Sequence, residues 1–145
     1  MEVLNFYFRR QSYCLEISQI AEILNASSIF PLPGIPPAFE GLFQLRGKII
    51  SLLNFPRCFG SGNEPAESQI IIFAEPAARF AIRVPAPVEA KSLEFGETQW
   101  SEDRGPLFVI LKGTASDGNE IHHLISPDQL VAHAKNLIVN WRTRS

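Results

Sequence analysis

The most constraining feature of this sequence is a series of short runs of aromatic and β-branched residues, each bounded by turn-forming residues. The N-terminal runs are VLNFYFRR and YCLEI, followed by IAEIL, GLFQL and KIISLL; the later ones are QIIIFA, FAIRV, PLFVILK and EIHHLI. Runs of this kind predict short strands, and their close spacing favours a β barrel or sandwich over βαβ units. Gln11–Ser12 and Arg46–Gly47 are expected to be hairpin turns between neighbouring strands. If IAEIL is extended, Ile20, Glu22 and Leu24 lie on one face.

Two helical segments interrupt this pattern. The main one is expected over residues 127–140, because Ser126 is a favourable N-cap, Pro127 suits the first helical position and Gln129 completes a capping-box pattern. Apolar residues recur through it at helical spacing and reach Trp141, which favours packing against the core over a groove for a partner. The segment FPRCFG predicts one or two helical turns.

A faint internal repeat suggests two related lobes. GKIISLLNFPRCF and GNEIHHLISPDQL each contain a glycine turn, a strand and a proline that begins a helix. We expect a single domain over residues 1–145, with a first lobe over roughly 16–67. The second lobe is expected over roughly 68–126 together with the N-terminal strands.

Composition excludes several classes of protein. The 145 residues are long enough to bury a core without a metal or a disulfide, and 46% of them are hydrophobic. A formal net charge of -2 gives no general attraction for nucleic acid. No run of 18 apolar residues is present, so we expect no direct membrane insertion. Cys14 and Cys58 are expected to be reduced thiols, and the protein to be cytoplasmic or held at membrane receptor arrays by a partner.

No motif indicates catalysis or a cofactor. His122 and His123 are adjacent on a predicted strand and point to opposite faces, so the two cannot chelate one metal ion together. His133 has no cysteine or carboxylate at ligand spacing, and no serine lies in a G-x-S-x-G motif. We therefore expect no catalytic residue, no cofactor and no metal. A small β-barrel hydrolase stays a distant alternative, because distant residues can assemble a site.

The segment FPLPGIPPAFEGLFQLRGKII combines prolines and glycines with large apolar residues. Prolines reduce the entropy that a loop loses when a partner orders it, so this segment suits an exposed apolar contact surface. Ile35 and Phe39 could supply contact area. Equally, both residues could plug one end of a barrel, and one side chain could do both.

The run IAEILNASSIFPLPGIPPAFEGLFQLRGKIISLLNFPRCFG resembles the CheW family of chemotaxis coupling proteins. Glu22, LPGIPPAFEG and FQLRGKIISLLNFPRCFG correspond in order and spacing to the family's strand glutamate, its VPGAPPFVxG loop and its INLRGxVxPVVDLRxxFG segment. The later run LKGTASDGNEIHHLISPDQL resembles the family's closing segment more loosely. The resemblance implies a mainly β fold of two interleaved five-stranded SH3-like barrels with a C-terminal helix.

The resemblance also implies a non-enzymatic adaptor that couples the cytoplasmic tip of a chemoreceptor to the regulatory domain of a CheA-type histidine kinase. It assigns receptor binding to Ile20, Glu22, Leu24 and Arg46, with Glu22 and Arg46 paired beside the receptor groove. It assigns kinase binding to Ile35, Pro36 and Phe39.

Two departures from the family pattern leave alternatives open. Pro85 and Pro87 stand where the family has a regular strand along the groove, and proline cannot donate to a sheet. Asn54 replaces the aspartate of the family's VDLR motif. The alternatives are a divergent CheW-like protein that binds kinase without coupling receptors, and an adaptor that serves a pilus-type motility pathway.

Overall fold

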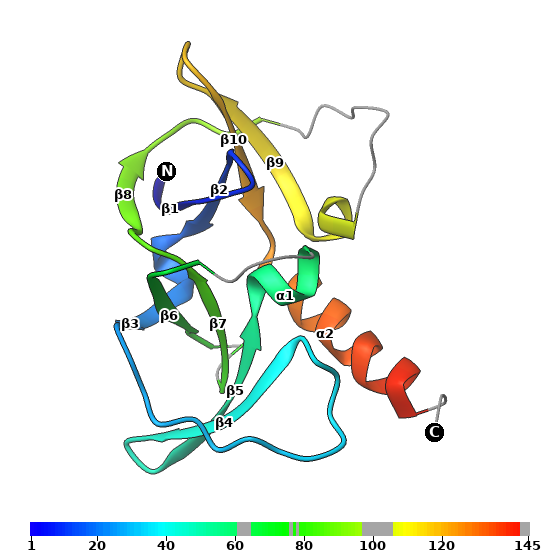
Figure 1. Ribbon diagram of the computed structural model, residues 1–145. Helices are drawn as coiled ribbons and strands as arrows, with labels where there is room; N and C mark the ends of the chain where they lie inside the picture. Colours follow the sequence, from blue (N-terminus) through cyan, green and yellow to red (C-terminus); the bar gives the residue numbers. More distant parts are fainter. Residues whose placement is uncertain (61–64, 76, 78, 97–105, 143–145) are drawn as a thin grey trace.

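The computed structural model describes residues 1–60, 65–75, 77, 79–96 and 106–142. The described strands form two five-stranded sheets (Figure 1). Sheet A contains, in spatial order, β8 (Glu89–Ser92), β1 (Glu2–Phe8), β2 (Gln11–Glu16), β10 (Ile121–Ile125) and β9 (Leu111–Ser116). Sheet B contains β3 (Ile20–Leu24), β6 (Ser68–Phe73), β7 (Phe80–Pro85), β5 (Lys48–Asn54) and β4 (Phe39–Leu45). The helices are η1 (Ile17–Gln19), α1 (Phe55–Phe59), η2 (Pro106–Ile110) and α2 (Pro127–Arg142).

Each sheet closes into a small barrel through the chain that follows its first edge strand. After β3, Phe30 pairs with Leu42 of β4 through two backbone hydrogen bonds of 2.7 and 2.9 Å. After β8, Gly96 pairs with Thr114 of β9 in the same way. A Cβ at Gly41 would lie 2.2 Å from the Phe30 carbonyl oxygen, so this closure requires glycine. We call the two units barrel A and barrel B after their sheets.

The two barrels have the same topology, which supports the internal repeat seen in the sequence. In both, two antiparallel hairpins meet along one parallel strand pair, β5 with β7 in barrel B and β10 with β2 in barrel A. A helix follows the parallel strand each time, α1 after β5 and α2 after β10. The predicted mainly β fold of two five-stranded barrels with a C-terminal helix is confirmed.

The largest core lies between the barrels. Strands that are buried on both faces send alternate side chains into this shared core and into their own barrel, as the alternation of β-strand side chains dictates. On β6, for example, Ile71 and Phe73 face the shared core, whereas Ile70 and Ile72 fill barrel B. Phe55 of α1 packs edge-on against Phe6 and Phe8 of β1, and thereby joins the helix to both barrels.

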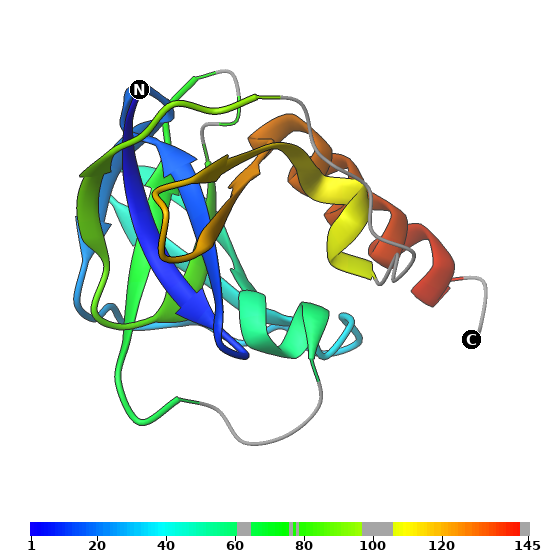
Figure 2. The same ribbon diagram turned by 90° about the horizontal axis from the view of Figure 1, so that it is seen from above.

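Helix α2 covers one side of this shared core, beside α1 (Figures 1 and 2). It begins as the sequence predicts, with the backbone N–H of Gln129 donating to Ser126 Oγ at 3.3 Å. Leu130 and Ala134 are buried, and His133 stacks on Phe59 of α1. The apolar stripe emerges from the core toward its C-terminal end, where the Trp141 residue is 37% exposed. Within the described part of the chain, no helix combines the length and hydropathy that crossing a bilayer requires.

Two local expectations differ from the structure, and two further features had no specific prediction. The first hairpin turns at Arg9–Arg10, both with positive φ, because Gln11 and Ser12 already pair with Phe8 and Tyr7. The apolar run PLFVI forms the 3-10 helix η2, and only its continuation forms β9. Strand β8 has the polar sequence EAKS, which carries no strand signal. Pro85 is the last residue of β7 and pairs with Ser68 of β6. The pairing of β7 with β5 ends before it, at Arg83.

The expected lobe boundary after residue 67 is also wrong. Strands β6 and β7 belong to barrel B, where β6 pairs with β3 and β7 pairs with β5. Barrel B therefore runs from β3 to Pro85, and barrel A combines β8 to β10 with the N-terminal hairpin. The physical reason is that β6 carries isoleucines on both faces and must be covered on both, by the interior of barrel B and by the shared core.

Candidate partner-binding surfaces

A groove opens at one end of barrel B and encloses a cavity of about 290 Å³. Its walls come from β3, from the β4–β5 turn and from the segment after β6, and its apolar floor includes Ile50 and Ile72. Basic and acidic side chains stand around it, namely those of Glu22, Arg46, Lys48, Glu75 and Arg79. An apolar floor with a charged rim is the usual arrangement of a surface that binds another protein.

Glu22 and Arg46 form an ion pair at the edge of this groove. Two parallel hydrogen bonds join them, from Arg46 Nη1 to Glu22 Oε2 at 2.6 Å and from Nη2 to Oε1 at 3.1 Å. The Arg46 side chain is 73% exposed and that of Glu22 26% exposed, so solvent screens the pair. Arg46 occupies the first turn position with a φ of 50°, next to Gly47 with a φ of 78°. The two-residue turn therefore fixes the guanidinium near the groove, and the bidentate geometry fixes its orientation.

The predicted common face of Ile20, Glu22 and Leu24 on β3 is wrong for Ile20, because a bulge lies between Ile20 and Glu22. The bulge turns Ile20 to the face of the sheet opposite Leu24. Ile20 packs against the shared core between the barrels, and Leu24 packs against the interior of barrel B. Neither side chain lines the groove, whereas Ala21 and Glu22 do. The arrangement thus brings together two of the four residues assigned to receptor binding, Glu22 and Arg46.

Pro85 and Pro87 do not form a wall of this groove. Pro87 lies beside Asn25 and Gln69, where β3 ends and β6 begins. The groove lies toward the other end of this strand pair, where Phe73 is. Lys48 and Arg79 line the groove instead, on the β4–β5 hairpin and in the β6–β7 connection. The family pattern does not indicate these two cations, because it places the second wall of the groove on the segment after β7.

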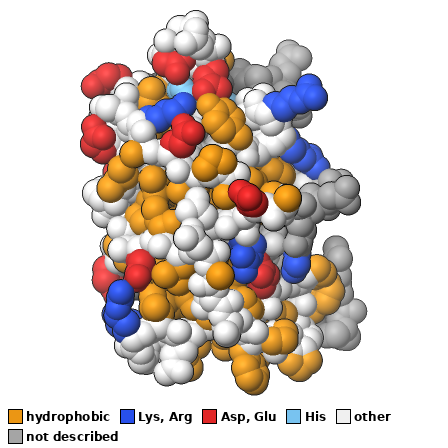
Figure 3. Space-filling model, turned by 60° about the vertical axis from the view of Figure 1, so that its left-hand side comes forward, with side chains coloured by type: hydrophobic (Ala, Val, Ile, Leu, Met, Phe, Trp, Pro, Cys, Tyr) orange, Lys and Arg blue, Asp and Glu red, His pale blue; other side chains and the backbone are white. Residues whose placement is uncertain are grey.

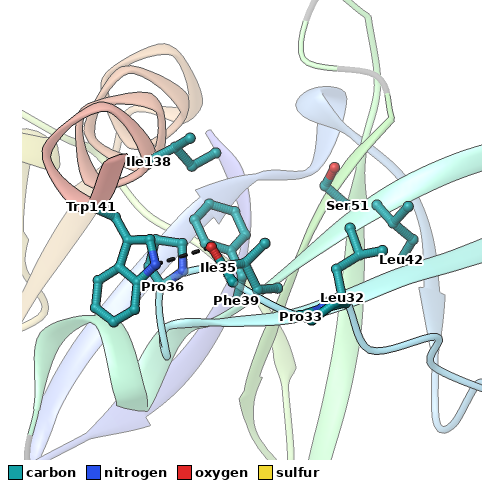
Figure 4. A pocket seen from close by; sticks show the side chains of 11 residues that line it. Leu32, Pro33, Ile35, Pro36, Phe39, Leu42, Ser51, Ile138 and Trp141 are labelled. Atoms are coloured by element: carbon teal, nitrogen blue, oxygen red, sulfur yellow. Dashed lines mark hydrogen bonds between the residues drawn. The ribbon is translucent and has the colours of Figure 1, made fainter. Parts of the chain in front are cut away.

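The proline-rich loop and the end of α2 enclose a second cavity of about 360 Å³ (Figure 4). All three residues assigned to kinase binding, Ile35, Pro36 and Phe39, line it. Trp141 faces Pro36 across the cavity and donates from Nε1 to the carbonyl oxygen of Gly34 at 3.0 Å. The loop is thus held from the helix side by a tryptophan that the sequence predicts only as part of an apolar stripe.

Phe39 and Ile35 differ in what else they do. Phe39 also packs against the shared core, so it is both a cavity wall and a core residue. Ile35 is half-buried and lines the cavity without joining the core cluster. Phe39 thus belongs in part to the core between the barrels, and the contact of Ile35 and Phe39 with a partner stays a prediction.

A half-buried polar cluster holds the loop's last residues to barrel B. Arg83 Nε donates to Glu40 Oε2 at 2.5 Å, and Asn54 Nδ2 donates to the same oxygen at 3.1 Å. Asn54 Oδ1 in turn accepts from the backbone N–H of Arg57 and caps α1. An asparagine can donate to Glu40 and cap a helix at once, whereas an aspartate would add a second negative charge beside Glu40. Asparagine in place of the family's aspartate at position 54 is therefore compatible with the nearby Glu40 carboxylate and with the cap of α1.

Two groups of reactive side chains do not form an accessible catalytic site. Ser12, His122 and Asp117 are linked by hydrogen bonds in the order of a nucleophile, a base and an orienting acid, but Ser12 is 1% exposed and inside barrel A. A substrate carbonyl cannot reach a hydroxyl in that position. Burial raises the pKa of Cys58 to about 12, so its thiol stays protonated and unreactive near neutral pH.

The fold and these surfaces define a class of protein in which two joined β barrels present apolar surfaces. The family model for the CheW-like domain matches residues 2–135. The chain therefore belongs to the CheW-like domain family.

Individual relatives agree with this assignment. The chain is 30% identical over 73 residues to a protein of Thermotoga maritima named "Chemotaxis protein CheW", an alignment that covers 50% of this chain and 48% of that one. It is 29% identical over 58 residues to the protein of the same name from Treponema pallidum, covering 40% and 34% of the two chains. These alignments thus span half or less of either relative. The crystal structure of the scaffolding protein TtCheW from Thermoanaerobacter tengcongensis has the same fold, with a TM-score of 0.75, 22% identity, and coverage of 86% of this chain and 88% of that one.

Proposed function

We propose that this protein is a chemotaxis adaptor that couples a chemoreceptor to a CheA-type histidine kinase. The observation that carries the proposal is the Glu22–Arg46 pair, held bidentate at the edge of an apolar groove. Family membership supports the same role. In this proposal the receptor's cytoplasmic helical tip lies in the groove, and the kinase's regulatory domain contacts the cavity of the proline-rich loop.

The groove suits a helical partner for physical reasons. An amphipathic helix can place apolar side chains on the floor formed by Ile50 and Ile72 and present acidic side chains to Lys48 and Arg79. Charges at the rim of such a contact set orientation and association rate more than affinity. The Glu22–Arg46 pair then presents one carboxylate and one guanidinium in a fixed order, which selects the direction of the bound helix.

The experiment measures receptor-tip and kinase-domain binding separately for two variants. Arg46→Glu should weaken receptor binding more than Arg46→Ala, because reversal places a second negative charge beside Glu22 whereas truncation only removes a partner. Arg10→Glu is the matched control, since Arg10 also occupies a positive-φ hairpin turn, in the other barrel. Equal and negligible effects of both Arg46 variants, in folded protein, would contradict receptor binding in this groove. Kinase binding that persists without receptor binding would favour the divergent adaptor instead.

The kinase surface is tested with Ile35 because Phe39 also supports the core. Ile35→Ala should weaken binding of the regulatory domain by about 1–2 kcal/mol, the scale of a moderate interface contact. Phe39→Ala should weaken binding similarly but also lower the melting temperature. Val139→Ala serves as the control, because Val139 is an exposed apolar residue on α2 that does not line the cavity. Unchanged binding by Ile35→Ala would remove this loop from the kinase contact.

A further inference from the structure

The open end of barrel A carries a group of metal-ligand side chains that the proposed adaptor function does not use. Asp117 and Glu120 flank the β9–β10 turn, and His122 lies on β10 immediately after it. One ligand atom from each of the three lies within 4.8 Å of the other two. In the face shown in Figure 3, acidic side chains gather with a basic side chain and a histidine at the upper end of the molecule.

We propose that Asp117, Glu120 and His122 form a binding site for a divalent metal ion, with Zn²⁺ as the ion that the three ligands fit best. His122 Nε2 lies 2.9 Å from Asp117 Oδ2 and 3.8 Å from Glu120 Oε1. In a tetrahedral zinc site, ligand atoms about 2.0–2.1 Å from the metal lie about 3.3 Å from one another. The two observed separations bracket that value, and the third, between the two carboxylates, is at most 4.8 Å. Rotations of the carboxylate side chains would bring the three atoms to the required spacing.

The Asp117 carboxylate is already oriented by the turn. Its Oδ1 accepts the backbone N–H groups of Asn119 and Glu120 at 2.9 and 3.0 Å, which leaves Oδ2 directed at His122. Gly118 supplies the positive φ of 90° that this turn requires. The turn therefore holds the Asp117 carboxylate in place and leaves its second oxygen free for the site.

The His122 ring is held by the partner that a metal-bound histidine needs. Its Nδ1 lies 2.5 Å from Ser12 Oγ, and Ser12 Oγ also accepts a hydrogen bond from Asn5 Nδ2. With Nδ1 protonated and donating to Ser12, Nε2 presents its lone pair to the ion. Such outer hydrogen bonds fix both the tautomer and the ring orientation of metal-ligating histidines. The buried ring is thus preorganised, while the two carboxylates face solvent and provide the entry path.

Two neighbours set the strength of the site. Tyr7 donates to Glu120 Oε1 at 2.5 Å, and Lys91 Nζ lies 3.7 Å from the same oxygen. A metal ion must displace or rearrange these contacts and tolerate the ammonium charge nearby. The site is therefore an exchangeable one with a fourth position open to water, rather than a closed structural site of four protein ligands.

The choice of Zn²⁺ follows from the ligand types. One imidazole with two carboxylates is a mixed nitrogen and oxygen set that zinc accepts in tetrahedral geometry. Ca²⁺ and Mg²⁺ prefer six or more oxygen ligands and would find too few here. Ca²⁺ and Mg²⁺ therefore serve as competitors in the test, and neither should displace zinc at a similar concentration.

The test is isothermal titration calorimetry of the full chain with ZnCl₂, with thermal unfolding as a second readout. We expect one zinc ion per chain and a rise in melting temperature. Asp117→Asn and Glu120→Gln should each lower zinc affinity about tenfold or more, at least the loss typical of outer-shell changes at metal sites. Both substitutions keep a side-chain oxygen for the turn and for Tyr7, so folding should be preserved. Lys91→Met should raise affinity, because it removes the competing cation.

His123→Gln and His133→Gln are the matched controls, since both remove a histidine outside the proposed site. Neither should change zinc affinity or stoichiometry. Absence of zinc binding by the unmodified chain would overturn the proposal. So would zinc binding that survives Asp117→Asn and Glu120→Gln, or that is lost in either histidine control, because the ion would then be held elsewhere.

Discussion

The two barrels share one topology but are filled with different chemistry. In barrel B, the neighbouring strands β6, β7 and β5 place three side chains side by side in a purely apolar row. These are Ile72, Ala81 and Leu52. The corresponding row of barrel A contains Asn5, Cys14 and Leu124. Among the residues that the structure describes, the apolar cluster inside barrel A has three buried members, whereas that inside barrel B has six.

The same contrast appears at the barrel ends. In barrel B the next row includes Ile50 and Arg79, and it lines the open groove. In barrel A the next row is Tyr7, Ser12 and His122, whose hydrogen bonds fill that end and connect it to the turn after β9. The same fold thus has an open groove at one end of barrel B and a polar network at the equivalent end of barrel A. A dry interior in barrel B supplies the stability that an open apolar groove requires.

The largest effect should come from making barrel B resemble barrel A. Ile72→Asn replaces a buried side chain with an amide that has no partner in the row, and should lower the free energy of unfolding by about 4 kcal/mol. Chemical denaturation measures this directly. Ile49→Asn on β5 is the control, because Ile49 is exposed and should change stability by less than about 0.5 kcal/mol. Similar losses for both variants would mean that the interior of barrel B is not dry.

Local features of the fold were predictable from the sequence, and pairings were not. The β4–β5 hairpin and α2 follow from alternation, from Arg46–Gly47 and from the Ser126 cap, all of which act within a few residues. The placement of β6 and β7 in barrel B depends on contacts with strands far along the chain, which no local pattern encodes. The run PLFVI predicts a strand but forms a 3-10 helix, because a short apolar run has no period that distinguishes strand from helix.

The candidate surfaces divide in the same way. Family motifs indicated Glu22 and Arg46, and their bidentate pairing is what the structure contains. Lys48 and Arg79 were missed because they meet only when the β6–β7 connection lies beside the β4–β5 turn. Asp117 and Glu120 precede His122 at short spacing, D-x-x-E-x-H, which could have been noticed. The position of His122 beside Ser12 depends on the register between β10 and β2, which the sequence does not reveal.

A smaller effect should come from interrupting the polar network of barrel A. Ser12→Ala removes the hydroxyl between Asn5 and His122 and leaves both without that partner, which should cost about 2 kcal/mol. Ser18→Ala is the control, because Ser18 is exposed and loses only one long hydrogen bond, of 3.4 Å, to Glu16. A loss for Ser12→Ala no greater than that of the control would show that barrel A is held by its few apolar side chains alone.

Barrel A should also account for part of the protein's sensitivity to acid. Burial and the neighbouring His122 lower the pKa of His123, so the folded state favours its neutral form. The stability that this supplies is present above the unfolded pKa of about 6.5 and is lost as pH falls through the folded pKa. His123→Gln should therefore reduce the drop in melting temperature between about pH 7 and pH 5. The reduction should be partial, because burial also lowers the pKa of His133. Identical pH profiles for variant and unmodified protein would exclude His123 as a source.

The smallest effect on stability should come from the ion pair at the open end of barrel B. Solvent screens the Glu22–Arg46 pair, so Arg46→Ala should lower the free energy of unfolding by less than about 1 kcal/mol. Ser12→Ala at the equivalent end of barrel A should cost more, because its hydrogen bonds are buried. A double-mutant cycle with Glu22→Ala isolates the pair itself and should give a coupling of about 0.5 kcal/mol or less. A coupling well above 1 kcal/mol would mean that the pair contributes substantially to the stability of barrel B. The groove end of barrel B and the polar end of barrel A would then no longer differ in their contribution to stability. A small coupling combined with a large loss of receptor binding would instead support a role of Arg46 in receptor recognition. The residue would then contribute little to the stability of the fold and mainly to the affinity for the receptor.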